Sequence, residues 1–147
     1  MTYSKMMEYE ERASGKLKSY IEECLTMTKD IGEELCKQLS CDGDAGNIVI
    51  RVGNDMKLDP EGGLLFSTVV NLKETNIENT WRLYRERGTW RLMDLQENRS
   101  AIHLHENPEA PNTPPVPLSV GIAPMLKVIH NRVYRELSKK YHEPRWE

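Results

Sequence analysis

The segment that most constrains the fold is residues 79–95, NTWRLYRERGTWRLMDL. In this segment, two stretches of alternating apolar and polar side chains flank the pair Arg87 and Gly88. Alternation with a period of two puts one side of each stretch on a core and is typical of β-strands. A short glycine-containing turn between two such stretches joins antiparallel neighbours. The segment therefore predicts a β-hairpin and, with it, an antiparallel sheet.

The loop length at Arg87 and Gly88 decides which residues of this hairpin face each other. A three-residue loop that begins at Glu86 moves the register by one residue relative to a two-residue loop. The sequence leaves both open. The two-residue loop predicts three opposite pairs: Leu83 with Leu92, Arg85 with Trp90, and Trp81 with Asp94.

Two earlier stretches, residues 48–52 and 64–72, alternate in the same way. The sequence LDPEGG between them predicts a β-turn centred on Pro60 and Glu61, with Gly62 after it. We expect the last strand of the later hairpin to continue, through a bulge near residues 97–99, over residues 101–104. These stretches predict a curved antiparallel sheet of about four strands.

An amphipathic helix is predicted over residues 4–39. Its apolar stripe repeats at steps of three and four, and Met6 and Ala13 extend it toward the N-terminus. Gly15 weakens the helix and could divide it. The residues of the stripe are Leu17, Ile21, Cys24, Thr28, Ile31 and Leu35.

A second helix is predicted over residues 123–141, where Pro124 suits a first helical turn. Before it, residues 106–117 hold five prolines, which exclude a helix and a central strand. We expect this segment to be an extended crossing from the sheet to the helix.

These elements predict an α+β fold with a long N-terminal helix, a curved antiparallel sheet, and a C-terminal helix packed on the sheet. The 147 residues suit one domain with one core. Its expected parts are a helical segment at 1–40, the sheet at 47–105, the proline-rich crossing at 106–118 and a helix at 119–142.

The net charge of −3 is unevenly distributed. Residues 1–47 carry ten acidic side chains against six Lys and Arg, whereas residues 121–147 carry three against six. A general nucleic-acid binder would show a basic domain, so we do not expect nucleic acid as a partner. The distribution permits the acidic helix to lie near the basic one, within this chain or across a homodimer.

Several features predict a cytoplasmic protein with no membrane partner. No apolar run approaches the roughly 20 residues of a membrane helix, and the N-terminus is polar. Three cysteines, Cys24, Cys36 and Cys41, are odd in number and form no CxxC pair. We expect buried thiols rather than disulfides or a zinc site.

The hairpin 79–95 also supplies candidate ligand-binding residues, because it interleaves arginine with aromatic side chains. They could form a cross-strand ladder, a stacking surface for single-stranded nucleic acid, or the lining of a small-molecule pocket. The ladder needs nothing beyond the hairpin itself. The candidates are Trp81, Arg82, Tyr84, Trp90 and Arg91.

The sequence YRERGTWRLMDL, within this hairpin, is similar to the penultimate-to-last hairpin of nuclear-transport-factor-like cone folds. That resemblance implies a pocket between the sheet and the helices, with either ligand binding or simple enzyme activity. The helix predicted after the strands departs from the usual ending of that fold.

Candidate metal ligands occur in HLHENPE, where His103, His105 and Glu109 are spaced as in the first metal motif of the cupin family, which they resemble. Two imidazoles on one side of a strand can share a Zn, Fe or Mn ion, and Glu109 could add an oxygen. The glycines that frame the cupin motif are absent, and no later strand supplies a further histidine. The alternative is that both histidines lie at the sheet edge, and we expect no other cofactor.

No motif for nucleophilic catalysis, phosphate binding or metalloprotease activity is present, so no catalytic residue is assigned. The sequence therefore favours a small soluble binding or adaptor protein that self-associates or binds a protein partner. The alternative is a small-molecule-binding pocket protein or simple enzyme with a cone-like α+β fold.

Overall fold

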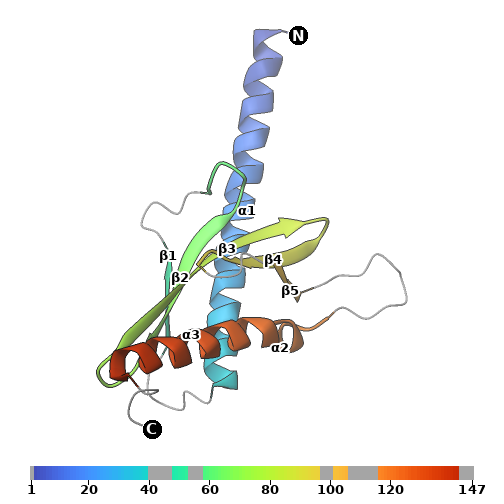
Figure 1. Ribbon diagram of the computed structural model, residues 1–147. Coiled ribbons are helices and arrows are strands. Elements are labelled where there is room, and N and C mark those ends of the chain that lie inside the picture. The colour runs from blue at the N-terminus through green and yellow to red at the C-terminus, as the bar shows by residue number, and fades with distance from the viewer. Residues whose placement is uncertain (1, 40–47, 53–57, 97–100, 106–115, 143–147) are drawn as a thin grey trace.

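A computed structural model describes residues 2–39, 48–52, 58–96, 101–105 and 116–142 of the chain. The predicted α+β architecture, with a long first helix, an antiparallel sheet and a last helix packed on it, is confirmed (Figure 1). Most of the expected proline-rich crossing lies outside the described residues. The elements in chain order are α1 (Tyr3–Gln38), β1 (Ile48–Val52), β2 (Leu64–Asn71), β3 (Asn76–Glu86), β4 (Thr89–Asp94), β5 (Ala101–His105), α2 (Leu118–Gly121) and α3 (Ala123–Tyr141).

The sheet has five antiparallel strands in the order β1-β2-β3-β4-β5, so each strand pairs with its neighbours in sequence. The expectation that the last strand continues through a bulge to residue 104 is wrong. Leu92 lies opposite Ile102, and β5 therefore runs antiparallel to β4 as a separate strand. A β-bulge and a reversal of the chain look alike in the sequence, because both interrupt the apolar alternation with polar residues. Only the pairing of the strands in the sheet distinguishes them.

The β3–β4 hairpin has the two-residue loop. Leu83 lies opposite Leu92 and Trp81 opposite Asp94, as that register requires. Arg87 and Gly88 both have positive φ, 51° and 78°. Positive φ at both central residues is the type I′ arrangement, whose twist matches that of the flanking strands.

The predicted turn before β2 is also confirmed. The Gly62 amide donates to the Asp59 carbonyl at 2.9 Å, which closes a β-turn around Pro60 and Glu61. The Asp59 carboxylate accepts from the amides of Glu61 and Gly63 at 2.9 and 2.8 Å. One acidic side chain thus fixes the backbone of the whole turn.

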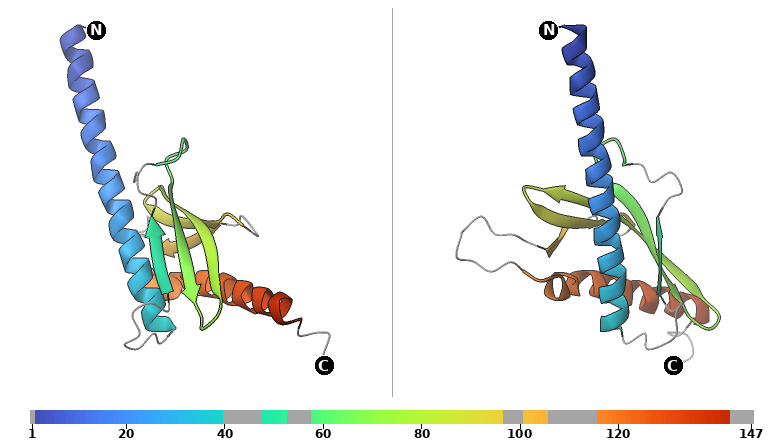
Figure 2. Two further views of the ribbon diagram at one scale, coloured as in Figure 1. Left: turned by 90° about the vertical axis from the view of Figure 1, so that its left-hand side faces the viewer. Right: turned by 180° about the vertical axis from the view of Figure 1, so that it is seen from behind.

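Alternate residues of β2, β3, β4 and β5 bury one face of the sheet. The C-terminal half of α1 covers this face together with α2 and α3, so both long helices share one core (Figure 2). The fully buried members of the core from the strands are Leu64, Trp81, Leu83, Leu92 and Leu104, with Phe66 nearly so. Those from the helices and their junction are Cys24, Ile31, Leu35, Ile122 and Met125, with Ile129 nearly so.

The helix predicted over residues 123–141 is confirmed as α3. The wider helical segment expected at 119–142 also contains the short helix α2, which is divided from α3 at Ile122. Pro124 stands at the start of α3, where a missing amide hydrogen costs nothing. Just before the division, a Cβ added at Gly121 would lie 2.6 Å from the carbonyl carbon of Leu104 in β5. This close approach of α2 to β5 needs a residue without a side chain.

The helix α1 has 36 residues and runs unbroken through Gly15. Thr2 caps it by accepting from the Lys5 amide at 3.3 Å. Only its C-terminal half meets the sheet, and every residue from 3 to 19 is exposed. This exposed part, residues 3–19, projects beyond the sheet and is called the arm below (Figures 1 and 2). Among the described residues, no helix has the length and apolar character needed to cross a membrane.

Candidate functional site

The five candidate ligand residues of the β3–β4 hairpin lie on two different faces of the sheet. Trp81 and Trp90 belong to the buried core, and Arg82, Tyr84 and Arg91 alternate with core positions on the other face. Side chains on opposite faces of one sheet cannot line the same pocket. Their role in ligand binding stays a prediction, and the two faces have to be considered separately.

Trp81 is fully buried, and its indole nitrogen donates to the Thr68 hydroxyl at 2.9 Å. Both its apolar ring and its one polar atom are therefore satisfied within the core. This contact joins β3 to β2, outside the hairpin itself.

On the opposite face, Arg82 is held by an ion pair with Asp59 in the turn before β2. The guanidinium Nε lies 2.7 Å from Asp59 Oδ2, with side chains only 12% and 18% exposed. The hydrogen bond from Arg82 lowers the pKa of the Asp59 carboxyl. The same bond raises the pKa of Arg82, whose guanidinium also lies 4.7 Å from the centre of the Tyr84 ring. Arg82 thus fixes the turn to the sheet.

Arg91, the third candidate on this face, lies near the end of the hairpin. Its Nε is 4.0 Å from Glu86 Oε2, at the limit of an ion pair. Because the Glu86 side chain is half exposed, this contact contributes little to stability.

Trp90 takes part in a cluster at the root of the arm. Its ring stacks on that of Tyr20, with centroids 6.3 Å apart and planes 5° apart. The Arg85 guanidinium lies 5.4 Å from each ring centre. Arg85 also contacts Glu23 at 2.6 Å, and its amide donates to the Tyr20 hydroxyl at 3.1 Å. Burial is the main cause that raises the pKa of Tyr20.

This root cluster consists of Tyr20, Glu23, Arg85 and Trp90. The sequence did not predict that these four residues contact one another. Tyr20 and Arg85 are 65 positions apart, and no local pattern links a helix to a hairpin tip at that separation. A shallow surface groove runs beside the cluster and is lined by Ser19, Glu22, Glu23, Thr26, Met27, Arg85 and Trp90. Arg85 is the only cationic side chain among the described residues that line the groove, and it is paired with Glu23.

A second group missed by the sequence consists of buried polar side chains on the core face. Asn79 and Asp94 are 0% and 1% exposed. Asp94 Oδ1 accepts from the Gln96 amide at 3.0 Å. Among the described residues, neither amide atom of Asn79 nor Asp94 Oδ2 has a hydrogen-bond partner. Each unpaired buried polar atom lowers the free energy of unfolding by about 1–3 kcal/mol, so this part of the core is less stable than a fully paired one.

Of the candidate metal ligands, only His103 has a described side chain, and it is exposed on β5. His105 belongs to the same strand, but its side chain lies outside the described residues, as does all of Glu109. Within the described part of the chain, no group of three or more His, Cys, Asp or Glu could hold a metal ion. The metal site at these three residues stays a prediction.

The described cysteines, Cys24 and Cys36, are free thiols. Cys24 is fully buried in the core, and this burial raises the pKa of its thiol. A raised pKa keeps the sulfur protonated and poorly nucleophilic. The prediction for Cys41 falls outside the described residues.

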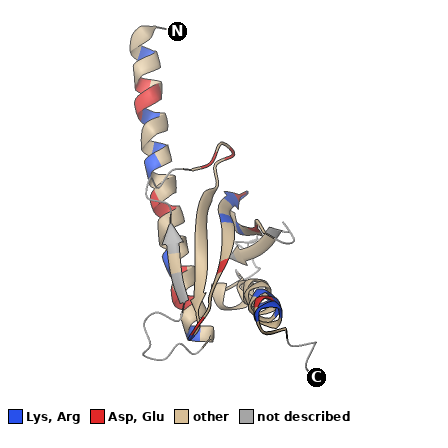
Figure 3. Cartoon of the chain, turned by 60° about the vertical axis from the view of Figure 1, so that its left-hand side comes forward, with Lys and Arg blue, Asp and Glu red and all other residues tan. Residues whose placement is uncertain are grey.

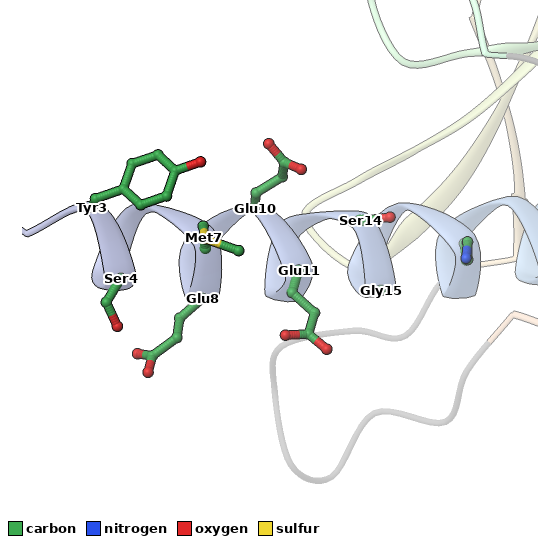
Figure 4. Close-up of a pocket in the computed structure, with 9 residues that line it drawn as sticks. Tyr3, Ser4, Met7, Glu8, Glu10, Glu11, Ser14 and Gly15 are labelled. Atoms are coloured by element: carbon green, nitrogen blue, oxygen red, sulfur yellow. The ribbon is translucent and has the colours of Figure 1, made fainter.

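The arm is an exposed helical segment that has charged residues of both signs and an apolar side (Figure 3). At 100° per residue, Met6, Ala13 and Leu17 continue the stripe that Cys24 begins in the core. Met6 and Leu17 are each 51% exposed and Tyr3 is 77% exposed. A shallow groove on the arm is lined only by side chains of α1 itself, among them Tyr3, Met7 and Ser14 (Figure 4). It reflects the spacing of helical side chains and is not a built cavity.

No family model matches the chain, and no curated protein or solved structure is significantly similar to it. A function for this chain is therefore argued from its own residues and their geometry.

Proposed function

We propose that this chain is a non-catalytic binding or adaptor protein that self-associates through the arm. The observation that supports this proposal is that every residue from 3 to 19 is exposed, on a helix whose C-terminal half packs into the core. A cytoplasmic location belongs to the same proposal and is supported by the free thiols of Cys24 and Cys36.

The energetics of helices support a partner for the arm. In proteins, most of the stability of a helix comes from packing of its apolar face rather than from helix propensity. Here the apolar face of α1 is packed at Cys24, Ile31 and Leu35 but uncovered at Met6 and Leu17. A second polypeptide on the arm would bury the remaining part of the same stripe.

The state of the candidate site residues also favours a binding role over catalysis. Trp81 is committed to the core, Arg82 to Asp59, and Arg85 to Glu23. Cys24 is buried as a thiol. These four side chains are thus engaged in contacts within the fold.

Sedimentation over a range of protein concentrations tests this function with a matched pair of variants. Leu17→Asp places a charge on the exposed stripe, and we expect it to abolish self-association. Ser19→Asp adds the same charge two residues along, about 200° around the helix, and we expect it to leave self-association unchanged. A wild-type chain that stays monomeric at every concentration would contradict the proposal.

A small-molecule pocket on the core face is the second candidate function, and the unpaired polar atoms of Asn79 and Asp94 favour it. If these atoms serve only the fold, Asn79→Leu removes an unsatisfied polar group and raises the free energy of unfolding. If they bind a ligand, the variant loses the thermal stabilisation that a screen of small polar compounds produces in the wild type. A screen that stabilises neither protein, together with a stabilised variant, removes this candidate.

A further inference from the structure

We draw no further inference here: the strongest candidate, the pair of buried polar side chains Asn79 and Asp94 on the core face of β3 and β4, belongs to the small-molecule pocket already described as the second candidate function, and nothing among the described residues shows what would bind to their unpaired atoms.

Discussion

Arg82 shows a residue whose structural contact is formed with a distant part of the chain, while its predicted role in ligand binding stays a prediction. From its place in the hairpin, Arg82 was predicted to bind a ligand, and the structure pairs it with Asp59, 23 positions earlier. The guanidinium occupies the space that a side chain at residue 63 would fill, and Gly63 leaves that space open. The sequence could not reveal this pairing, because it depends on how a loop returns over the outer face of the sheet.

The Asp59–Arg82 pair makes stability depend on pH in a defined direction. Because the pKa of Asp59 is lowered on folding, its contribution is present above the ordinary carboxyl pKa of about 3.9 and is lost as pH falls through the lowered value. We expect Asp59→Asn to lower the free energy of unfolding by about 1–3 kcal/mol at pH 7. The loss should shrink at pH 3, as measured by urea unfolding.

Glu61→Gln is the control for this prediction. Its carboxylate lies 3.8 Å from the same guanidinium, but its side chain is 85% exposed. Solvent screens such a contact, so we expect a change within about 0.5 kcal/mol at either pH. Equal losses in Asp59→Asn at pH 7 and pH 3 would show that the ion pair does not carry the pH dependence.

At the scale of elements, the sequence predicted the helices and turns that are determined by interactions between residues close together in the chain. The helical stripe of α1 and the turn after Asp59 depend on neighbouring residues and were predicted. The sequence left the loop at Arg87 and Gly88 open between two lengths, and the strand pairing shows the two-residue loop. The reversal that makes β5 a separate strand depends on pairing with β4, and local alternation cannot reveal it.

For the candidate site, the sequence identified the hairpin residues but not their two faces or their partners. The root cluster joins Tyr20 to Arg85 and Trp90, and it arises only when α1 crosses the hairpin. The exposure of Met6 and Leu17 was likewise hidden, because an apolar stripe looks the same whether or not a sheet covers it.

We expect the substitution of glycine by alanine to have opposite effects on stability at two positions in helices. A Cβ at Gly121 would overlap the backbone of Leu104, so we expect Gly121→Ala to lower the free energy of unfolding by about 1–3 kcal/mol. A Cβ at Gly15 meets no atom of the described chain within 4 Å. There the better helix propensity of alanine should raise helix stability by about 1 kcal/mol.

Urea unfolding followed by circular dichroism measures the effect at Gly121. At Gly15, hydrogen exchange of the arm amides is the more direct measurement, since the arm can unwind without the core. A neutral Gly121→Ala would mean that α2 can move away from β5 without loss of packing.

At the scale of the whole molecule, the chain consists of a compact body and a projecting arm on one continuous helix. The body is stabilised by its own core, whereas the stability of the arm helix depends on the molecule that packs against it. Local stability should therefore differ between the two, and in the proposed self-associated form that of the arm depends on protein concentration.

Hydrogen exchange at two protein concentrations tests this division. We expect amides of residues 3–19 to exchange rapidly in dilute solution and to become protected as concentration rises, while amides of β2, β3 and β4 stay unchanged. Leu17→Asp should remove the concentration dependence. Raising the salt concentration should weaken protection of the arm, because its charges are exposed and are screened. If the arm amides are equally protected at both protein concentrations, the contact that stabilises the arm lies within one chain.

The unbroken backbone of α1 also fixes a rotational phase between arm and body. Each residue of a helix advances the direction of its side chains by about 100°. Insertion of a single alanine after Ser19 would keep the associating surface of the arm intact, yet swing the attached body about the helix axis by that angle. In the proposed self-associated form, the mutual orientation of the sheets is therefore determined by the number of residues between the arm and the Tyr20–Trp90 stack.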